Sequence, residues 1–156
     1  MELTLHSEFP IDLEPEWDDL LTKSITHVPF LRYQYLIDWW TTRGGGEWSD
    51  DSELAIITAW QDSRLIGIAP FFIATHEDER RLLLLGSIEI SDYLDVICRE
   101  EDLDSFINEL VPFLKDNLVE SKSIQKLDLY NVCDCSPLVA ALKDVAEDLD
   151  LKFEVK

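Results

Sequence analysis

The sequence predicts an α/β (α+β) domain in which a mixed, mostly antiparallel central sheet is flanked by helices. The first reason is a pair of apolar runs, Leu54 to Trp60 and Leu65 to Ala74, which Gln61 to Arg64 separate as a turn. Such a pattern indicates an antiparallel hairpin. The second reason is that other segments repeat apolar residues at three- and four-residue spacing, which indicates amphipathic helices. The 156 residues suit one domain with a sizeable core.

The chain begins with a short predicted strand and two predicted helices. Leu3 and Leu5 alternate with polar residues, as in a strand. One helix is predicted from Pro15 to about Ser24, because proline is tolerated in the first turn of a helix. A second helix, rich in aromatic residues, is predicted from Leu31 to about Thr42. The glycines Gly44 to Gly46 follow and predict its end.

Further strands extend the hairpin into a meander. Leu82 to Leu85 are consecutive leucines and predict a strand that is buried on both faces. Tyr93 to Cys98 predict one more short strand. Pro70 lies inside the second hairpin strand and cannot donate a ladder hydrogen bond. It therefore predicts a bulge or an edge position.

The second half of the sequence reads as helix, strand, helix and strand. Apolar residues between Leu103 and Leu118 have helical spacing, and Pro112 should kink this helix. Lys126 to Tyr130 alternate as in a strand. Ser136 followed by proline predicts the start of another helix. The tail from Leu151 to Lys156 alternates again and predicts a last strand.

The charge of the chain excludes some classes of partner. Thirty-three acidic and 13 basic residues give a net charge of −20. Nucleic acids and anionic membrane surfaces would be repelled, and no run of lysine or arginine reverses the repulsion locally. We therefore expect no nucleic-acid partner. An anionic cofactor would need a specific device such as a helix N-terminus or a glycine-rich turn.

The N-terminus MELTLHSEFP has no basic and apolar leader, and no apolar run approaches the roughly 18 residues that a membrane span needs. We therefore expect a cytoplasmic protein without a membrane span. The three cysteines, Cys98, Cys133 and Cys135, suit reduced thiols in that compartment.

Several motifs carry no predicted chemistry. The glycines Gly44 to Gly46 lack a downstream Lys-Ser/Thr and do not form a phosphate-binding loop. Cys133 and Cys135 offer two thiols, whereas a structural zinc site needs four ligands, so no metal is expected. His6, His27 and His76 are isolated from any nucleophile motif, and a hydrolytic triad has no support.

The candidate binding residues follow the leucine strand. Ser91, Asp92, Tyr93 and Asp95 lie within a few positions of its end, where open α/β folds commonly bind ligands. The alternative is ordinary turn chemistry, with Tyr93 packed against the protein. If this segment is extended, Asp92 faces one side while Tyr93 and Asp95 face the other. Trp39 has two interpretations as well, because it either packs in the core or lines a substrate cleft.

A family resemblance adds to this interpretation. The segments that carry it are Pro29-Phe30, Trp39-Trp40, Ile68-Ala69-Pro70, Leu84-Leu85-Gly86, Ser91-Asp92-Tyr93-Leu94-Asp95 and Asn131 to Leu138. In order and spacing they resemble the amino-terminal half of the FemAB/CelD-like GNAT acyltransferases of bacterial polysaccharide and cell-envelope biosynthesis. The resemblance runs roughly from Trp17 to Leu142. It implies the element order β-α-α-β-β-β-α-β-α-β.

The resemblance also implies an activity, which is N-acyl transfer, such as acetyl transfer, from acyl-CoA to an amine or hydroxyl acceptor. Ser91, Asp92, Tyr93, Asp95 and Trp39 would then contact a small-molecule or saccharide acceptor. Acetyl-CoA or another acyl-CoA would be the co-substrate of the full-length protein, in which a second GNAT-like domain would follow this one. We thus expect residues 1–156 to form a single GNAT-like domain, the first of a tandem pair in a longer protein.

One feature departs from the family. GNAT enzymes hold the CoA pyrophosphate on a glycine-containing loop at a helix N-terminus. This chain has Arg99-Glu100-Glu101-Asp102 there, and these acids would repel a diphosphate. We therefore expect no cofactor to bind tightly to this chain alone. The alternative function is a non-catalytic GNAT-like module whose acidic surface docks a partner.

Overall fold

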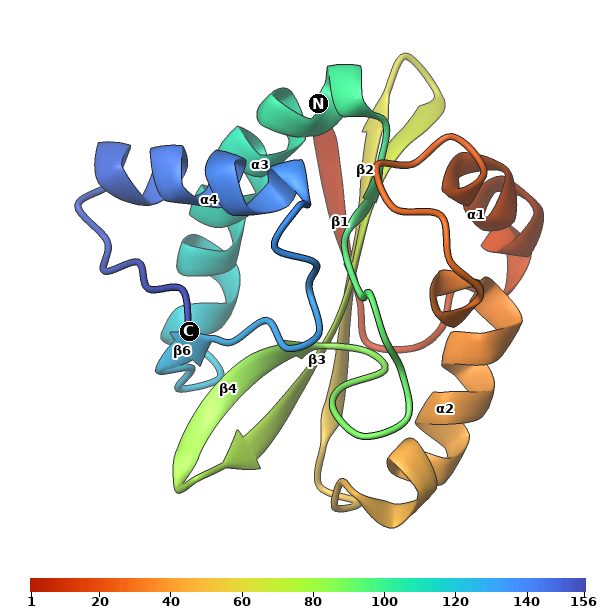
Figure 1. Cartoon of the computed structure of the whole chain (residues 1–156), viewed down its shortest axis with the longest axis vertical. Helices are drawn as coiled ribbons and strands as arrows, with labels where there is room; N and C mark the ends of the chain where they lie inside the picture. The colour runs from red at the N-terminus through yellow and green to blue at the C-terminus, as the bar shows by residue number, and fades with distance from the viewer.

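The computed structural model describes all 156 residues. A twisted sheet forms the middle layer, with α1 (Glu14–Leu21) and α2 (Tyr33–Gly46) on one side of it. The other side carries α3 (Glu100–Leu114) and α4 (Pro137–Asp148), as Figure 1 shows. Short 3₁₀ turns at Ile11–Leu13 and Pro29–Leu31 precede the first two helices. The predicted mixed, mostly antiparallel sheet flanked by helices is confirmed.

The sheet is built around the predicted hairpin. β2 (Glu53–Gln61) pairs antiparallel with β3 (Arg64–His76), and β1 (Glu2–His6) adds to the outside of β2. β4 (Glu79–Leu84) pairs antiparallel with β3 on its other side. The last neighbour, β6 (Lys126–Leu127), runs parallel to β4.

Two short strands share one side of β3. β4 covers its second half, where Leu84 pairs with Phe71, while β5 (Ile97–Cys98) covers its first half, where Ile97 pairs with Ile68. β4 and β5 therefore lie end to end along β3. Residues 85–96, named here the 85–96 loop, leave the sheet at the end of β4 and return to it at β5.

Pro70 lies at the seam between β4 and β5. Its carbonyl accepts from the Leu85 N–H at 2.8 Å, on the side where the chain leaves the sheet. In an antiparallel ladder the N–H and C=O of one residue point to the same neighbour. The N–H that proline lacks would therefore face the 85–96 loop, where no regular ladder continues. This explains how a central strand tolerates proline, for which a bulge or an edge was expected.

The helices end and begin where the sequence predicts, with local differences. α2 closes with left-handed backbone at Arg43 and at the glycines Gly44 and Gly45. α3 contains Pro112 and passes directly into a π-helical turn, Lys115–Val119. The Ser136 side chain accepts from the Leu138 N–H and caps α4.

The predicted burial of Leu82 to Leu85 is confirmed, because each of these side chains is at most 2% exposed. The strand starts earlier than predicted, at Glu79. Gly67 of β3 lets α3 approach the sheet closely, since a Cβ at this position would meet the Phe106 ring at 2.8 Å. Phe106 itself is fully buried. This contact fixes α3 against the first half of β3, beside β5.

Three predicted strands are absent or much reduced. The strand predicted from Lys126 to Tyr130 forms only at Lys126 and Leu127. The segment from Tyr93 to Cys98 forms a ladder only at Ile97 and Cys98. The tail 151–156 forms no strand. Its Leu151 N–H bonds instead to the Ala146 carbonyl, after a left-handed Asp150. This reverse turn ends α4, and Val155 is left 69% exposed.

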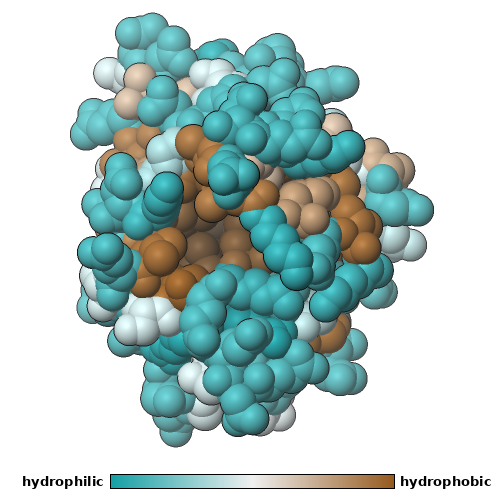
Figure 2. Space-filling view, turned by 90° about the vertical axis from the view of Figure 1, so that its left-hand side faces the viewer, coloured by the Kyte–Doolittle hydropathy of each residue, from teal (hydrophilic) through white to brown (hydrophobic).

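The side of the molecule that carries α3 and α4 is hollowed at its centre, and hydrophobic side chains surround the hollow (Figure 2). Half-buried apolar residues on this side come from both helices and from the segment after β6; they are Val111, Phe113, Leu129, Val132 and Leu142. No helix of the structure is both long and apolar enough to cross a membrane.

Candidate functional site

The 85–96 loop contains four of the five predicted site residues. Its first turn depends on Gly86, which has a φ of 103° that side chains rarely adopt. A Cβ there would also meet the Leu94 side chain at 2.8 Å. Leu94 is fully buried, so the two ends of the loop pack together around its side chain. The loop is thus a packed structure.

Tyr35 of α2 holds the middle of the loop. Its hydroxyl donates to the Ile90 carbonyl at 3.1 Å and lies 2.8 Å from Ser91 Oγ, within hydrogen-bonding distance. Ser91 is only 2% exposed. The hydroxyl of this predicted binding residue therefore faces α2 and joins the loop to that helix.

Asn131 holds the loop from the opposite side. Its side-chain amide donates to the carbonyls of Ile88 and Ser91, each at 2.7 Å. Its own carbonyl accepts from the Leu94 N–H at 2.8 Å. The residue has a φ of 63°, a conformation that asparagine tolerates better than most residues. One side chain and one backbone group thus fix three positions of the loop.

Asp95 closes the loop with a buried carboxylate. Its Oδ2 accepts from Thr26 Oγ1 at 2.7 Å and from Ser136 Oγ at 2.6 Å, and its Oδ1 accepts from the Val96 N–H at 2.9 Å. Burial raises the pKa of Asp95, while the hydrogen bonds to its carboxylate act in the opposite direction. Asp95 is fully buried and joins the α1 side, the loop and the start of α4.

Asp92 and Tyr93 are the predicted residues that reach solvent. Tyr93 is 57% exposed, and Asp92 beside it is exposed as well. The expected alternation is wrong, because Tyr93 has a left-handed φ of 57° and the segment is not extended. Asp92 and Tyr93 both reach solvent, while Leu94 and Asp95 are both buried. With Glu89 and Ile90 they form the exposed tip of the loop.

Trp39 does not line an open cleft. It is 3% exposed and packs on Phe72 of β3, with ring centroids 5.3 Å apart. The core interpretation of this residue is therefore the one that the structure confirms. Its indole Nε1 has no hydrogen-bond partner. Trp48, which packs on the same Phe72, donates its own Nε1 to the Ser87 carbonyl and supports the start of the loop.

A second polar cluster lies at the β3–β4 turn, and its role is structural. The Arg81 guanidinium is almost fully buried and donates to Glu77, Glu79 and Asp128 at 2.6–3.2 Å. Its charge is thus already paired within the protein. His76 packs edge to face against Tyr130, with ring centroids 5.8 Å apart. This cluster leaves no free cation for an anionic ligand.

The family resemblance places the CoA pyrophosphate at the start of α3, which follows β5 in the chain. β4 and β6 pair at only two positions, and beyond them the 85–96 loop is bonded to Asn131 across the gap. The first turn of α3 carries Glu100, Glu101 and Asp102 and no glycine. Glu100 and Glu101 are exposed, so their charges would face a bound diphosphate.

The expectation of three free thiols is wrong for two of the cysteines. Cys133 and Cys135 form a disulfide, and Cys98 alone is free and buried. With Asp134, their ligand atoms lie within 4.8 Å of one another. The two sulfur atoms are bonded to each other in this state, so the group offers no pair of thiolates to a metal.

Several solved structures with this arrangement are acetyltransferases. The chain is similar to glucosamine-6-phosphate N-acetyltransferase from Arabidopsis thaliana, with 15% identity and a TM-score of 0.55 over 100% of this chain and 95% of that one. It is also similar to an acetyltransferase from Trypanosoma brucei, with 16% identity and a TM-score of 0.55 over 99% and 94%. The chain has the GNAT fold. A ribosomal-protein-alanine N-acetyltransferase from Brucella melitensis biovar Abortus 2308 shares this fold at 12% identity and a TM-score of 0.53, over 99% and 94% of the chains.

The GNAT fold is thus recognised through structure. No protein-family model matches the sequence, and no curated protein matches it at a significant level. At these identities the likeness shows the fold and leaves the chemistry to the residues of this chain.

Sequence reasoning missed the residues that hold the loop, namely Tyr35, Asn131, Thr26 and Ser136. Two of them gave a signal. Ser136 was recognised as a helix start, and Asn131 lies in a segment that carries the family resemblance. Thr26 and Tyr35 gave no such signal, because their partners are more than 50 residues away in the sequence.

Proposed function

We propose that this GNAT-fold domain provides the acceptor side of an acyl transfer, and that the acyl-CoA donor is held outside it. The acceptor is an amine or a hydroxyl compound, such as a small molecule or a saccharide. The setting that we propose is a FemAB-like cytoplasmic protein of polysaccharide biosynthesis, with a second GNAT-like domain in the same polypeptide. The observation that carries the proposal is the exposed tip of the loop, with Asp92 and Tyr93, which the buried residues Ser91, Leu94 and Asp95 hold in place.

The chemistry of the loop tip suits such an acceptor. A carboxylate at Asp92 pairs with an ammonium group or accepts hydrogen bonds from sugar hydroxyls. The Tyr93 ring offers an apolar face with a polar end, which suits stacking on a sugar ring. Glu89 adds a second exposed carboxylate to the same tip. Because Tyr35, Asn131 and Asp95 fix the loop, a ligand would meet these groups already in position.

The acidic start of α3 supports the placement of the donor elsewhere. Binding a diphosphate at this helix would require overcoming the charges of Glu100 and Glu101. The two cations beside the helix start, Arg64 and Arg99, already pair with Asp102 at 3.6 and 3.8 Å. The residues of this chain therefore bind and orient the acceptor in the proposed function. Removal of its proton and stabilisation of the developing negative charge are left to groups beyond this domain.

Calorimetry with acetyl-CoA tests the first half of the proposal. The isolated chain is expected to give no saturable heat, because Glu100 and Glu101 are exposed at the start of α3 and its cations, Arg64 and Arg99, already pair with Asp102. Saturable binding of acetyl-CoA would show that the donor site lies in this domain and would contradict the proposal.

Nuclear magnetic resonance titration with glucosamine, which carries both an amine and hydroxyls, tests the second half. Saturable shifts of the Asp92 and Tyr93 amides are expected, and Asp92→Asn and Tyr93→Phe should weaken them. Asp104→Asn, at an exposed position of α3, is the matched control and should change nothing. If both loop variants bind glucosamine as the unchanged chain does, these residues are not part of an acceptor site.

The second candidate is a non-catalytic module that docks a basic partner, which the net charge of −20 favours. The two functions differ in their response to salt. Docking of a basic peptide should weaken steeply as salt increases, because it rests on screened charges. Binding of a basic peptide together with no response to glucosamine would favour the module.

A further inference from the structure

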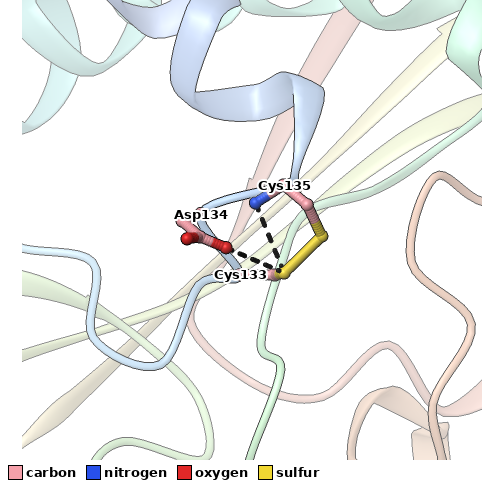
Figure 3. Close-up of side chains that lie close together, drawn as sticks. All are labelled: Cys133, Asp134 and Cys135. Carbon is pink, nitrogen blue, oxygen red and sulfur yellow. Dashed lines mark hydrogen bonds between the residues drawn. A yellow bond between two sulfur atoms is a disulfide. The ribbon is translucent and has the colours of Figure 1, made fainter.

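Cys133 and Cys135 form a disulfide at the surface, directly ahead of α4. Their Cα atoms are 5.1 Å apart, within the range of ordinary disulfides. Cys135 is exposed and Cys133 is half-buried, so small molecules in solution can reach the pair. Figure 3 shows the two sulfur atoms joined on one side of a tight turn whose other side carries Asp134. Neither the fold nor the proposed acceptor function uses these residues.

The surroundings of the two sulfur atoms differ. Cys135 immediately precedes the Ser136 cap of α4, and the N-terminus of a helix favours a thiolate. Asp134 Oδ1 lies 3.6 Å from Cys133 Sγ, and its negative charge disfavours a thiolate there. The Cys135 N–H, at 3.4 Å from the same sulfur, offsets part of that effect. Cys135 is thus the better leaving group when the disulfide is opened.

We propose that Cys133 and Cys135 are a reversible thiol–disulfide site whose partner is a small-molecule thiol such as glutathione. The thiolate of glutathione attacks Cys133 Sγ, forms a mixed disulfide and releases the Cys135 thiolate. A second glutathione thiolate attacks the glutathione sulfur of the mixed disulfide and releases the Cys133 thiolate. The protein disulfide gains two electrons, the protein thiolates take up protons according to pH, and glutathione disulfide is the oxidised product.

The pair is linked to the 85–96 loop through short stretches of backbone and the hydrogen bonds at their ends. The Ser136 N–H donates to the Cys133 carbonyl at 2.9 Å, so the turn that the disulfide closes also positions Ser136. Ser136 Oγ donates to Asp95 of the loop. On the other side of the turn, Asn131 holds the Ile88 and Ser91 carbonyls. Opening the disulfide frees the backbone between these two anchors and loosens the loop.

The third cysteine supplies a control within the same chain. Cys98 is fully buried in β5, and burial raises the pKa of its thiol to about 12. It is therefore shielded from both attack and ionisation. Its Sγ donates to the Arg99 carbonyl at 3.3 Å. A response that belongs to the exposed pair should survive replacement of Cys98.

Equilibration of the full chain in buffers of glutathione and glutathione disulfide, followed by acid quenching, alkylation and mass spectrometry, tests the site. The thiols of Cys133 and Cys135 should appear together in one two-electron transition, and Cys98→Ala should leave that transition unchanged. Cys135→Ser should abolish the internal disulfide and leave Cys133 to form a mixed disulfide with glutathione. A pair that stays as thiols in the most oxidising buffer, or as a disulfide in excess dithiothreitol, would overturn the proposal.

Amide hydrogen exchange in the two redox states tests the link to the loop. The Leu94 and Val96 amides should exchange about fivefold faster in the reduced chain, the population change that corresponds to weakening one ordinary hydrogen bond. The double variant Cys133→Ser, Cys135→Ser should match the reduced chain in every buffer. Equal exchange rates in both states would show that the pair does not act on the loop.

Discussion

Asp95 is a carboxylate that solvent does not reach, and its hydrogen bonds come from three separate parts of the chain. Thr26 follows α1, Val96 belongs to the loop and Ser136 begins α4. A buried carboxylate is retained only where donors replace its lost hydration. The loop that carries Asp92 and Tyr93 therefore depends on a residue that was itself predicted to contact the ligand.

Replacing Asp95 with asparagine is expected to flatten the pH dependence of the free energy of unfolding. Because its folded pKa is raised above the ordinary value of 3.8, the folded chain holds a proton more readily than the unfolded chain. The stability from this group is full below the ordinary pKa and is lost as the pH rises through the folded pKa. Urea unfolding at a series of pH values measures the slope. The exposed Asp92→Asn is the control and should keep the original slope.

Asn131→Gly is expected to lower the free energy of unfolding by about 2 kcal/mol, the order expected for two lost hydrogen bonds to buried carbonyls. Glycine accepts the left-handed backbone at this position, so the loss reports the side chain alone. Asp150→Gly is a matched control, since Asp150 is also left-handed, at a φ of 54°, and is exposed. Urea denaturation compares the two variants; equal stabilities would show that the Asn131 amide contributes nothing to the loop.

The site residues show which features of the folded loop a local sequence pattern can predict. The stretch from Ser91 to Asp95 was predictable as a polar group after a buried strand. The side on which each of these residues lies was not predictable, because the left-handed backbone at Tyr93 breaks the alternation of an extended segment. The partners of these residues come from distant segments, so no local pattern could indicate them.

At the scale of elements, the clearest local patterns produced the correct structures. The hairpin of β2 and β3, the leucine strand and the helix starts at Pro15 and Ser136 all follow from composition and spacing. The tail 151–156 has the alternation of a strand and forms none, because its first N–H is used to end α4. A strand needs a neighbouring edge, which the sequence of one segment does not reveal.

Gly67→Ala is expected to destabilise the protein by about 1–3 kcal/mol, the usual cost of overpacking a core. The new methyl group would meet the Phe106 ring at 2.8 Å and push α3 away from the sheet. Combining it with Phe106→Leu should restore part of the loss by making room, which a double-mutant cycle in urea would measure. If the two single changes are simply additive, the close approach of α3 does not rest on this glycine.

The whole molecule carries a net charge of −20, which acts on every element at once. Many acids have no cation to pair with, since 33 acidic residues share 13 basic ones. The compact state concentrates this repulsion, and salt screens it over about 10 Å at 0.1 M. The acidic surface therefore shapes stability as well as partner choice.

Added sodium chloride should raise the melting temperature of the chain by a few degrees before levelling off, because screening relieves the repulsion in the folded state. Calorimetric scans in low salt and at about 0.15 M salt measure the shift. Sucrose at matched osmolality is the control for effects that do not involve charge. A melting temperature that does not respond to salt would mean that the unpaired acids lie too far apart to repel.

Because β4 and β5 lie end to end on β3, the alignment of the sheet does not depend on the 85–96 loop that connects them. Residues 85–96 stand opposite only Ala69 and Pro70, because Leu84 and Ile97 are each registered on β3 independently. The exposed residues of this excursion, Glu89, Ile90, Asp92 and Tyr93, can then vary without shifting the alignment of any strand, while the buried Leu94 and Asp95 must stay. Evolution could exchange these exposed residues as a cassette, and an engineer could graft another peptide at the loop tip while keeping Leu94, Asp95 and both strands.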